Sequence, residues 1–471
     1  MRNIEVENTN TISPIHKLVL FNIEIARKNI QKKKIIFRDK RGLNKESLLE
    51  DINTNMLKKD GDPCQHRPQN KRDCPECYSE LYYHIAKETY ENKCPIVEKE
   101  IVIKENAPWF CSEILHAKRN KRKKERAMNR LYNDRTRDEF KQARNELTHL
   151  INIKKKEFYK RKTEEAGNDI GKLYNILDGL TGKSKKQSLP ESPSDIELAN
   201  KFAEFFESKI TTIFDNIEIV ENYQTVVQRE PQNKLYRFEK TNQQRIEKIV
   251  KKVKPTHCDN DPFPFSEVKN SERLPLILDI YTKIVNLCIE NKIIPTTEKS
   301  ALINPILKTN LDSQCLKSYR PVSNLPFLSK IIENVILDQL QTHLNDNNIL
   351  PDNQSAYRQM YSTETALCSI VNDLIINTEK GECSLLILLD LSAAFDTVVH
   401  NTLYKDLKKI GIDGDALELL SNYLQGRTYN VKIRNSISQI KPLKRGVPQG
   451  SVLGPILFCI YHRTLIYFEK T

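Results

Sequence analysis

Residues 385–390 constrain the fold of this chain more than any other segment. Five aliphatic residues run without a break from Leu385 to Leu389, and the run ends at Asp390. An uninterrupted apolar run of this length predicts a strand that is buried on both faces. A carboxylate at the end of such a strand either caps it, pairs with a cation or binds a metal ion. We therefore expect this strand to place one carboxylate at the edge of a sheet, where an ion can be held.

A second motif follows about fifty residues later. Residues 445–455 read Arg-Gly-Val-Pro-Gln-Gly-Ser-Val-Leu-Gly-Pro, a loop punctuated by glycine and proline that opens an apolar helix. In the first segment, Phe395 and Asp396 come shortly after Asp390. Together the two segments resemble motifs A and B of the reverse transcriptase palm, in the form found in jockey-like non-LTR retrotransposons.

This resemblance implies a site and a chemistry. Asp390 and the carbonyl of Leu391 would bind Mg²⁺, because nucleotidyl transfer uses two metal ions held by carboxylates from at least two strands. Phe395 would exclude a 2′-hydroxyl and so select deoxynucleotides. Gln449 would lie against the nucleotide, and Asp396 is interpreted as structural. The Asp-Asp motif that should follow is not found before Thr471, so we expect a chain truncated at both ends with an incomplete active site.

Further motifs resemble the fingers of the same family. Residues 318–326 read Ser-Tyr-Arg-Pro-Val-Ser-Asn-Leu-Pro, and Lys308 and Arg320 would bind the incoming triphosphate. Arg358, in a Gln-Ser-Ala-Tyr-Arg segment, would contact a template phosphate. Ser362 is expected to cap a helix. The implied partners are an RNA template, a DNA primer and deoxynucleoside triphosphates.

The resemblance implies an α/β (α+β) architecture, with right-hand polymerase fingers and a partial palm after a mostly helical basic linker. We expect four regions: a poorly ordered remnant that follows an endonuclease domain (1–104), the basic linker (105–240), the fingers (241–384) and the partial palm (385–471). Apolar periodicity predicts helices at 196–214, 243–253, 274–290 and 327–340, and a strand at 301–308.

The chain is basic, with a net charge of +13, which favours a polyanionic partner or simply solubility. The densest basic run contains Lys121, Arg122, Lys123 and Lys124. Apolar residues at helical spacing from Phe140 to Phe158 continue it, which predicts an amphipathic helix with a cationic face. Nucleic-acid binding and a merely solvated helix face are both open interpretations.

Eleven cysteines scattered over 471 residues do not form a disulfide framework, and reduced thiols are expected. Cys64, His66, Cys74 and Cys77 lie close in sequence, and the last two have the C-x-x-C spacing of zinc ligands. The first two are closer together than in an ordinary zinc finger, so a loop with incidental cysteines is the favoured interpretation. No apolar run is long enough for a membrane span and the N-terminus does not resemble a signal peptide, so we expect an intracellular protein, in the cytoplasm or nucleus.

The resemblance covers 240–461 strongly and 10–240 more weakly. It implies RNA-directed DNA polymerisation in an intact ancestor and an inactive fragment here. Two alternatives remain open: a non-catalytic nucleic-acid-binding protein, and a translated relic without a function.

Overall fold

The computed structural model divides the chain into two compact units. Unit 1 comprises Met1–Arg38 and Ile96–Lys186, and unit 2 comprises Asp39–Pro95 and Gln187–Thr471. The second segment of unit 1 therefore interrupts unit 2 in the sequence. The structure describes the residues 4–7, 18–21, 32–59, 61–64, 71–102, 107–167, 169–181, 189–215, 231–254, 256–308, 311–391 and 393–463.

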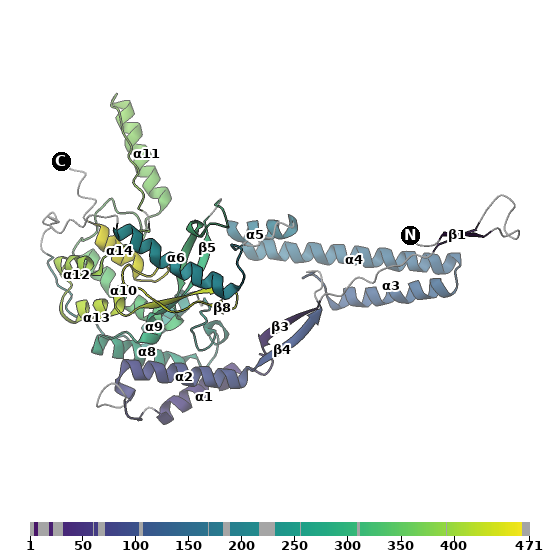
Figure 1. Cartoon of the computed structure of the whole chain (residues 1–471), viewed down its shortest axis with the longest axis horizontal. Coiled ribbons are helices and arrows are strands. Elements are labelled where there is room, and N and C mark those ends of the chain that lie inside the picture. The colour runs from purple at the N-terminus through teal and green to yellow at the C-terminus, as the bar shows by residue number, and fades with distance from the viewer. Residues whose placement is uncertain are drawn as a thin grey trace. The chain divides into compact units, whose positions relative to one another are not determined.

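Unit 1 contains two strand pairs and a helical hairpin. Both strand pairs are antiparallel: β1 (Ile4–Glu7) with β2 (Leu18–Phe21), and β3 (Lys32–Arg38) with β4 (Ile96–Val102). The helices are α3 (Ser112–Arg130), α4 (Asp134–Ala166) and α5 (Ile170–Thr181). Figure 1 shows α3 and α4 side by side. The turn between them ends at Asn133, whose side chain caps α4 by accepting a hydrogen bond from the Thr136 N–H at 2.8 Å.

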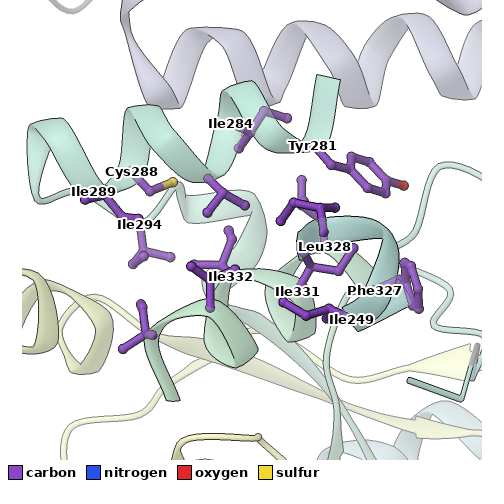
Figure 2. Close-up of a cluster of buried hydrophobic side chains, with 14 of the residues drawn as sticks. Ile249, Tyr281, Ile284, Cys288, Ile289, Ile294, Phe327, Leu328, Ile331 and Ile332 are labelled. Atoms are coloured by element: carbon purple, nitrogen blue, oxygen red, sulfur yellow. The ribbon is translucent and has the colours of Figure 1, made fainter. Parts of the chain in front are cut away.

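Helices form the larger core of unit 2. They are α1 (Lys45–Lys59), α2 (Pro75–Lys93), α7 (Gln243–Lys252), α8 (Leu274–Asn291), α9 (Thr296–Lys299), α10 (Phe327–Asp346), α12 (His400–Lys409), α13 (Gly414–Leu424) and α14 (Gly454–His462). Figure 2 shows Tyr281, Ile284 and Cys288 of α8 near Leu328 and Ile331 of α10. These residues recur every three or four positions, which gives each helix one apolar face to bury.

A five-stranded sheet forms the second part of unit 2. β5 (Ser300–Leu307) pairs antiparallel with β6 (Tyr319–Asn324) and parallel with β7 (Thr428–Ile433). The short strands β8 (Ser436–Ile437) and β9 (Lys441–Pro442) pair antiparallel with β7. The sheet thus joins segments that are more than a hundred residues apart in sequence.

Helix α6 (Asp195–Asp215) covers one face of this sheet (Figure 1). Its residues Phe202 and Phe206 are buried against sheet residues that include Ile303 and Tyr429. Burying each phenylalanine contributes on the order of 2 kcal/mol. Helix α6 is therefore a structural part of the unit that contains the sheet.

The helices and the strand predicted from apolar periodicity are confirmed, with ends that agree to within six residues, as α6, α7, α8, α10 and β5. The predicted cap at Ser362 is also confirmed. Ser362 Oγ accepts a hydrogen bond from the Thr365 N–H at 3.2 Å at the start of α11 (Thr363–Glu379). None of the helices in the described ranges is both long and apolar enough to cross a membrane.

Two expectations differ from the structure. The first concerns residues 45–93, which were expected to be poorly ordered. They form α1 and α2, and side chains such as Leu48 and Tyr82 are buried in the core. The helical spacing of their apolar residues favours order, and the charged neighbours obscure that spacing in the sequence.

The buried strand predicted at 385–389 is wrong. These five residues form no strand, and Leu389 is 89% exposed. An aliphatic run becomes a strand only where neighbouring strands satisfy its backbone and cover its side chains. No strand in the described part of the chain pairs with it. Helix α11, which precedes it, also has no buried residue and stands apart from the other helices of unit 2 (Figure 1).

Candidate functional site

The loop that contains Gln449 is hydrogen-bonded to the turn that contains Phe395. The Gly446 N–H donates to Val398 O and the Val447 N–H donates to Phe395 O, both at 2.8 Å. Gly446 has a φ of +81°, and a Cβ atom at this position would lie 2.7 Å from Phe395 O. Only glycine allows the two backbones to approach this closely. The two segments recognised in the sequence are therefore directly joined.

Gln449 connects this pair of segments to the sheet. Its side-chain Nε2 donates to Asp396 Oδ2 at 3.0 Å, and its carbonyl accepts a hydrogen bond from the Ser323 N–H of β6 at 2.8 Å. The backbone of Gly450 approaches β6 equally closely, because a Cβ at this position would lie 2.7 Å from Ser323 O. Three sequence motifs that span 318–455 thus meet at Gln449.

Asp396 lies at the centre of this junction. Burial raises the pKa of its carboxyl to about 6, although Lys209 of α6 and the hydrogen bond from Gln449 both favour the ionised form. The interpretation of Asp396 as structural fits its contact with Gln449. The same side chain also faces a cavity.

This cavity lies between α6, the sheet and the Gln449 loop, and the centre of a water molecule can occupy about 40 Å³ of it. Its walls include both the apolar side chains of α6 and the polar groups of the loop. The residues that line it are Phe206, Lys209, Ile210, Ala301, Ile303, Pro321, Ser323, Asp396, Arg427, Thr428, Tyr429, Leu443, Val447, Pro448 and Gln449.

Arg427 places a buried cation in the cavity wall. The residue is 2% exposed, and its Nη1 donates to Tyr423 O at 3.0 Å. Its Nε and Nη2 have no hydrogen-bond partner within the described residues. Burial and the charge of Arg427 lower the pKa of nearby Lys299 to about 8. Buried donors of this kind are satisfied in nearly all proteins, so this guanidinium has capacity for an anionic ligand.

Sequence reasoning missed Arg427 and Lys209. An isolated arginine between a helix and an alternating strand carries no local signal of burial. Lys209 lies on the polar side of an amphipathic helix, where a lysine is ordinarily solvated. Only the packing of α6 on the sheet brings these two residues to the same cavity.

The far end of the Gln449 loop is held by Glu333 of α10. Glu333 Oε2 accepts hydrogen bonds from the N–H groups of Val452 at 2.6 Å and Leu453 at 3.0 Å. Its Oε1 accepts from Ser329 Oγ at 3.1 Å. The buried carboxylate therefore binds the backbone donors at the start of α14, where the helix dipole favours an anion.

The other predicted site residues lie outside the cavity. Phe395 stacks on Phe458 with ring centroids 4.8 Å apart, and only its backbone joins the junction. Arg320 is exposed on β6, and its neighbours Pro321 and Ser323 rather than Arg320 itself line the cavity. Lys308 is half-buried and does not line it.

Arg358 makes local contacts. Its Nη1 donates to Pro351 O at 3.0 Å, and its guanidinium lies 4.8 Å from the centre of the Tyr361 ring. These contacts hold the side chain beside the start of α11. Its predicted contact with a template phosphate remains a prediction.

Asp390 and Leu391 do not form part of a metal site in the described residues. Both are exposed, in the segment where the predicted strand is missing. Within the described ranges, the side chains that gather three or more metal-ligand atoms are cysteines, not carboxylates. The described residues therefore do not fit the pair of Mg²⁺ ions that the motifs imply.

The basic run 121–124 divides into two pairs on α3. Lys124 Nζ lies 2.8 Å from Glu139 of α4, and Lys121 Nζ lies 5.4 Å from the centre of the Phe140 ring. These two lysines stabilise the hairpin.

Arg122 and Lys123 are exposed and form no ion pair with any described residue. They share one helix face with three further exposed cations, Arg119, Arg126 and Arg130. Counted from Arg119, the five residues stand at positions i, i+3, i+4, i+7 and i+11, which fall on the same side of a helix.

Residues 306–467 match the protein family described as "Reverse transcriptase (RNA-dependent DNA polymerase)". The chain therefore contains a reverse transcriptase-like domain, and the junction at Gln449 lies inside it.

Relatives of this domain come from mobile elements. The "Probable RNA-directed DNA polymerase from transposon BS" of Drosophila melanogaster is 31% identical over 220 residues, which are 46% of this chain and 24% of that protein. The "RNA-directed DNA polymerase from mobile element jockey" of the same species is 34% identical over 184 residues, which are 39% of this chain and 20% of the relative. The chain thus spans about a quarter or less of the length of these relatives, and its resemblance to jockey-like elements is confirmed.

Proposed function

We propose that this chain is part of the reverse transcriptase of a jockey-like non-LTR retrotransposon, and that its domain binds RNA template and deoxynucleoside triphosphate. Residues 241–384 correspond in this proposal to the fingers and 385–471 to part of the palm. Residues 1–104 derive from the region after an endonuclease, and 105–240 form the basic linker. The observation that carries the proposal is the junction at Gln449, which joins three polymerase-like motifs through hydrogen bonds.

The polar groups beside the junction suit a phosphate-bearing ligand. Arg427 has two donor nitrogens without a partner in the described residues, and Lys209 adds a second cation to the same cavity. Guanidinium and ammonium groups bind phosphate oxygens by charge-assisted hydrogen bonds. Gln449 adds polar atoms at the edge of the cavity. Arg320 lies on β6, Lys308 directly follows β5, and both are proposed to contact phosphates of the same complex.

DNA polymerisation requires a catalytic metal site in addition to the binding of template and nucleotide. The reverse transcriptase family generally depends on a divalent metal, for which Mg²⁺ is the proposed ion. Asp390 and the Leu391 carbonyl are the proposed ligands, with Phe395 as the residue that selects deoxynucleotides. Within the described ranges, Asp390 belongs to no group of three or more metal-ligating side chains. We therefore expect binding of template and nucleotide by this polypeptide without primer extension.

A binding and extension assay on the full chain tests the proposal. Fluorescence anisotropy with a labelled primer on an RNA template should show that Arg427→Gln and Lys209→Gln each weaken binding severalfold. Lys201→Gln, on the same helix as Lys209, is the control. Lys201 forms an exposed ion pair with Glu197, so this variant should bind normally. Equal binding by all three variants would mean that nucleic acid does not bind at the cavity that contains Arg427 and Lys209. Primer extension that disappears in Asp390→Ala would contradict the expected inactivity.

A second candidate function rests on α3. The exposed cations from Arg119 to Arg130 line one helix face without ion-pair partners in the described residues, as a surface for nucleic-acid phosphates would require. This surface favours a non-catalytic role in nucleic-acid binding, which is compatible with the first proposal. Paired substitutions within residues 121–124 test it, because one pair of cations is free to contact phosphates and the other pair is engaged inside the hairpin.

A further inference from the structure

Three cysteine sulfurs converge at the start of α2. The Sγ atoms of Cys64, Cys74 and Cys77 all lie within 4.8 Å of one another, and those of Cys64 and Cys77 are 3.3 Å apart. Cys74 and Cys77 are 2% and 4% exposed. Zn–S bonds of about 2.3 Å at tetrahedral angles would place the sulfurs about 3.8 Å apart, close to the arrangement found here.

We propose that Cys64, Cys74 and Cys77 bind a structural zinc ion. A disulfide would use only two of the three sulfurs and would leave the third thiol without a role. The C-x-x-C spacing of Cys74 and Cys77 lets two thiolates reach the same ion. The favoured interpretation of these cysteines as incidental thus differs from their position in the structure. His66 lies outside the described residues, and the proposal does not depend on it.

Two of the three cysteines lie at the N-terminus of a helix. Cys74 is the N-cap of α2, Pro75 is its first residue, and Cys77 lies in its first turn. The partial positive charge of a helix N-terminus stabilises thiolates, the form that binds zinc. The segment that contains Cys64 is held nearby by an independent contact, because the Lys71 N–H donates to Asp62 O at 2.8 Å.

The zinc ion would act as a cross-link within unit 2. Cys64 follows the end of α1, and Cys74 precedes α2, so the ion would close the loop between the two helices. Both helices pack on α8. There the hydroxyl groups of Tyr82 and Tyr281 are hydrogen-bonded, with their oxygens 2.9 Å apart. Three sulfurs fill three positions of a tetrahedral ion, and the fourth belongs to water or to a further side chain.

Metal analysis of the full-length protein tests the proposal. Protein purified with a reductant and dialysed against a weak chelator should retain about one equivalent of zinc, and Cys64→Ser, Cys74→Ser and Cys77→Ser should each lose it. Cys315→Ser is the matched control, since Cys315 is exposed and lies outside the cluster. Co²⁺ substitution should give a thiolate-to-cobalt absorption band in the wild type and in Cys315→Ser alone.

A measurement on the unaltered chain covers the case in which a variant does not fold. Zinc should slow the alkylation of Cys64, Cys74 and Cys77 at least about tenfold relative to chelator-treated protein, as mapped by mass spectrometry. Alkylation of the exposed Cys315 and Cys383 should not change. Zinc-free wild-type protein, equal zinc in the three cluster variants, or a Cys64–Cys77 disulfide in the reduced preparation would each overturn the proposal.

Discussion

Gln449 donates a hydrogen bond from its side-chain amide to the carboxylate of Asp396, with Nε2 and Oδ2 3.0 Å apart. This contact joins two loops more than fifty residues apart in sequence. It also holds an ionisable group in a partly buried position, where burial raises the pKa of Asp396 to about 6. The junction should therefore respond to pH.

Asp396→Asn should remove this pH dependence. The pKa of about 6 in the folded chain exceeds the ordinary value of 3.8, so the folded state binds the proton more tightly. The resulting stabilisation is complete below pH 3.8 and is lost as the pH rises through 6. Asparagine does not titrate and still offers an oxygen to Gln449. We expect the variant to be more stable than wild type by about 1–2 kcal/mol at pH 7.5, with the difference shrinking toward pH 4.

Denaturant titrations at several pH values from about 4 to 8 measure this difference. Asp390→Asn is the control, because Asp390 is exposed and should leave the pH profile unchanged. A profile for Asp396→Asn parallel to that of wild type would show that the carboxyl is not held in the buried position described.

Gly446→Ala should strongly destabilise unit 2. The new Cβ would meet Phe395 O at 2.7 Å and the Asp396 backbone at 2.8 Å, in addition to the strain of a positive φ. Gly426 has a φ of +67°, but a Cβ added there would meet no atom within 4 Å. Gly426→Ala therefore measures the cost of the positive φ without a steric clash. We expect a loss of about 3 kcal/mol or more for Gly446→Ala and about 1 kcal/mol for Gly426→Ala, measured by chemical unfolding. Equal losses would contradict the close approach of the two loops.

Glu333→Ala should uncouple the Gln449 loop from α10. Two backbone N–H groups at the start of α14 would lose their acceptor in a buried position, which costs about 2–4 kcal/mol. Asp338→Ala on the same helix removes only a surface ion pair with Arg245 and should cost at most about 1 kcal/mol. Thermal unfolding compares the two variants. Similar melting temperatures would mean that Glu333 contributes no more than a surface charge.

The double variant Arg122→Gln/Lys123→Gln should weaken binding to single-stranded RNA. Losing two phosphate contacts should reduce the slope of log K against log salt by about 1.4. Lys121→Gln/Lys124→Gln carries the same charge change, but it removes contacts with Phe140 and Glu139 inside the hairpin. It should keep most of the affinity and lower the stability of the hairpin. Filter binding at several salt concentrations distinguishes the pairs, and equal losses would favour nonspecific attraction by net charge.

Local patterns predicted much of the fold. The apolar spacing of Phe202 and Phe206 predicted α6, and the hydroxyl of Ser362 predicted the start of α11, because both effects act within a few residues. The strand at 385–389 could not be judged in this way. Its formation depends on neighbouring strands, and strand propensity largely measures that context.

The site was predictable only in part. The glycines and prolines around Gln449 indicated a loop that opens a helix, but not that its backbone approaches Phe395 and Ser323 closely. Arg427 and Lys209 reach the cavity through the packing of α6 on a sheet whose strands come from distant segments. The convergence of the three cysteine sulfurs likewise depends on how the loop between α1 and α2 closes, which residue spacing does not determine.

The insertion of residues 96–186 of unit 1 within unit 2 has a consequence for synthesis on the ribosome. Helices α1 and α2 pack on α8, which begins at Leu274, about 180 residues after the end of α2 at Lys93. At about 5–20 residues per second, the apolar faces of α1 and α2 emerge about 9–36 seconds before the helix that covers them. During that interval, the nascent chain presents side chains such as Leu48 and Tyr82 to water and to molecular chaperones. A metal ion bound between the two helices would hold them together as a preformed pair until α8 is made.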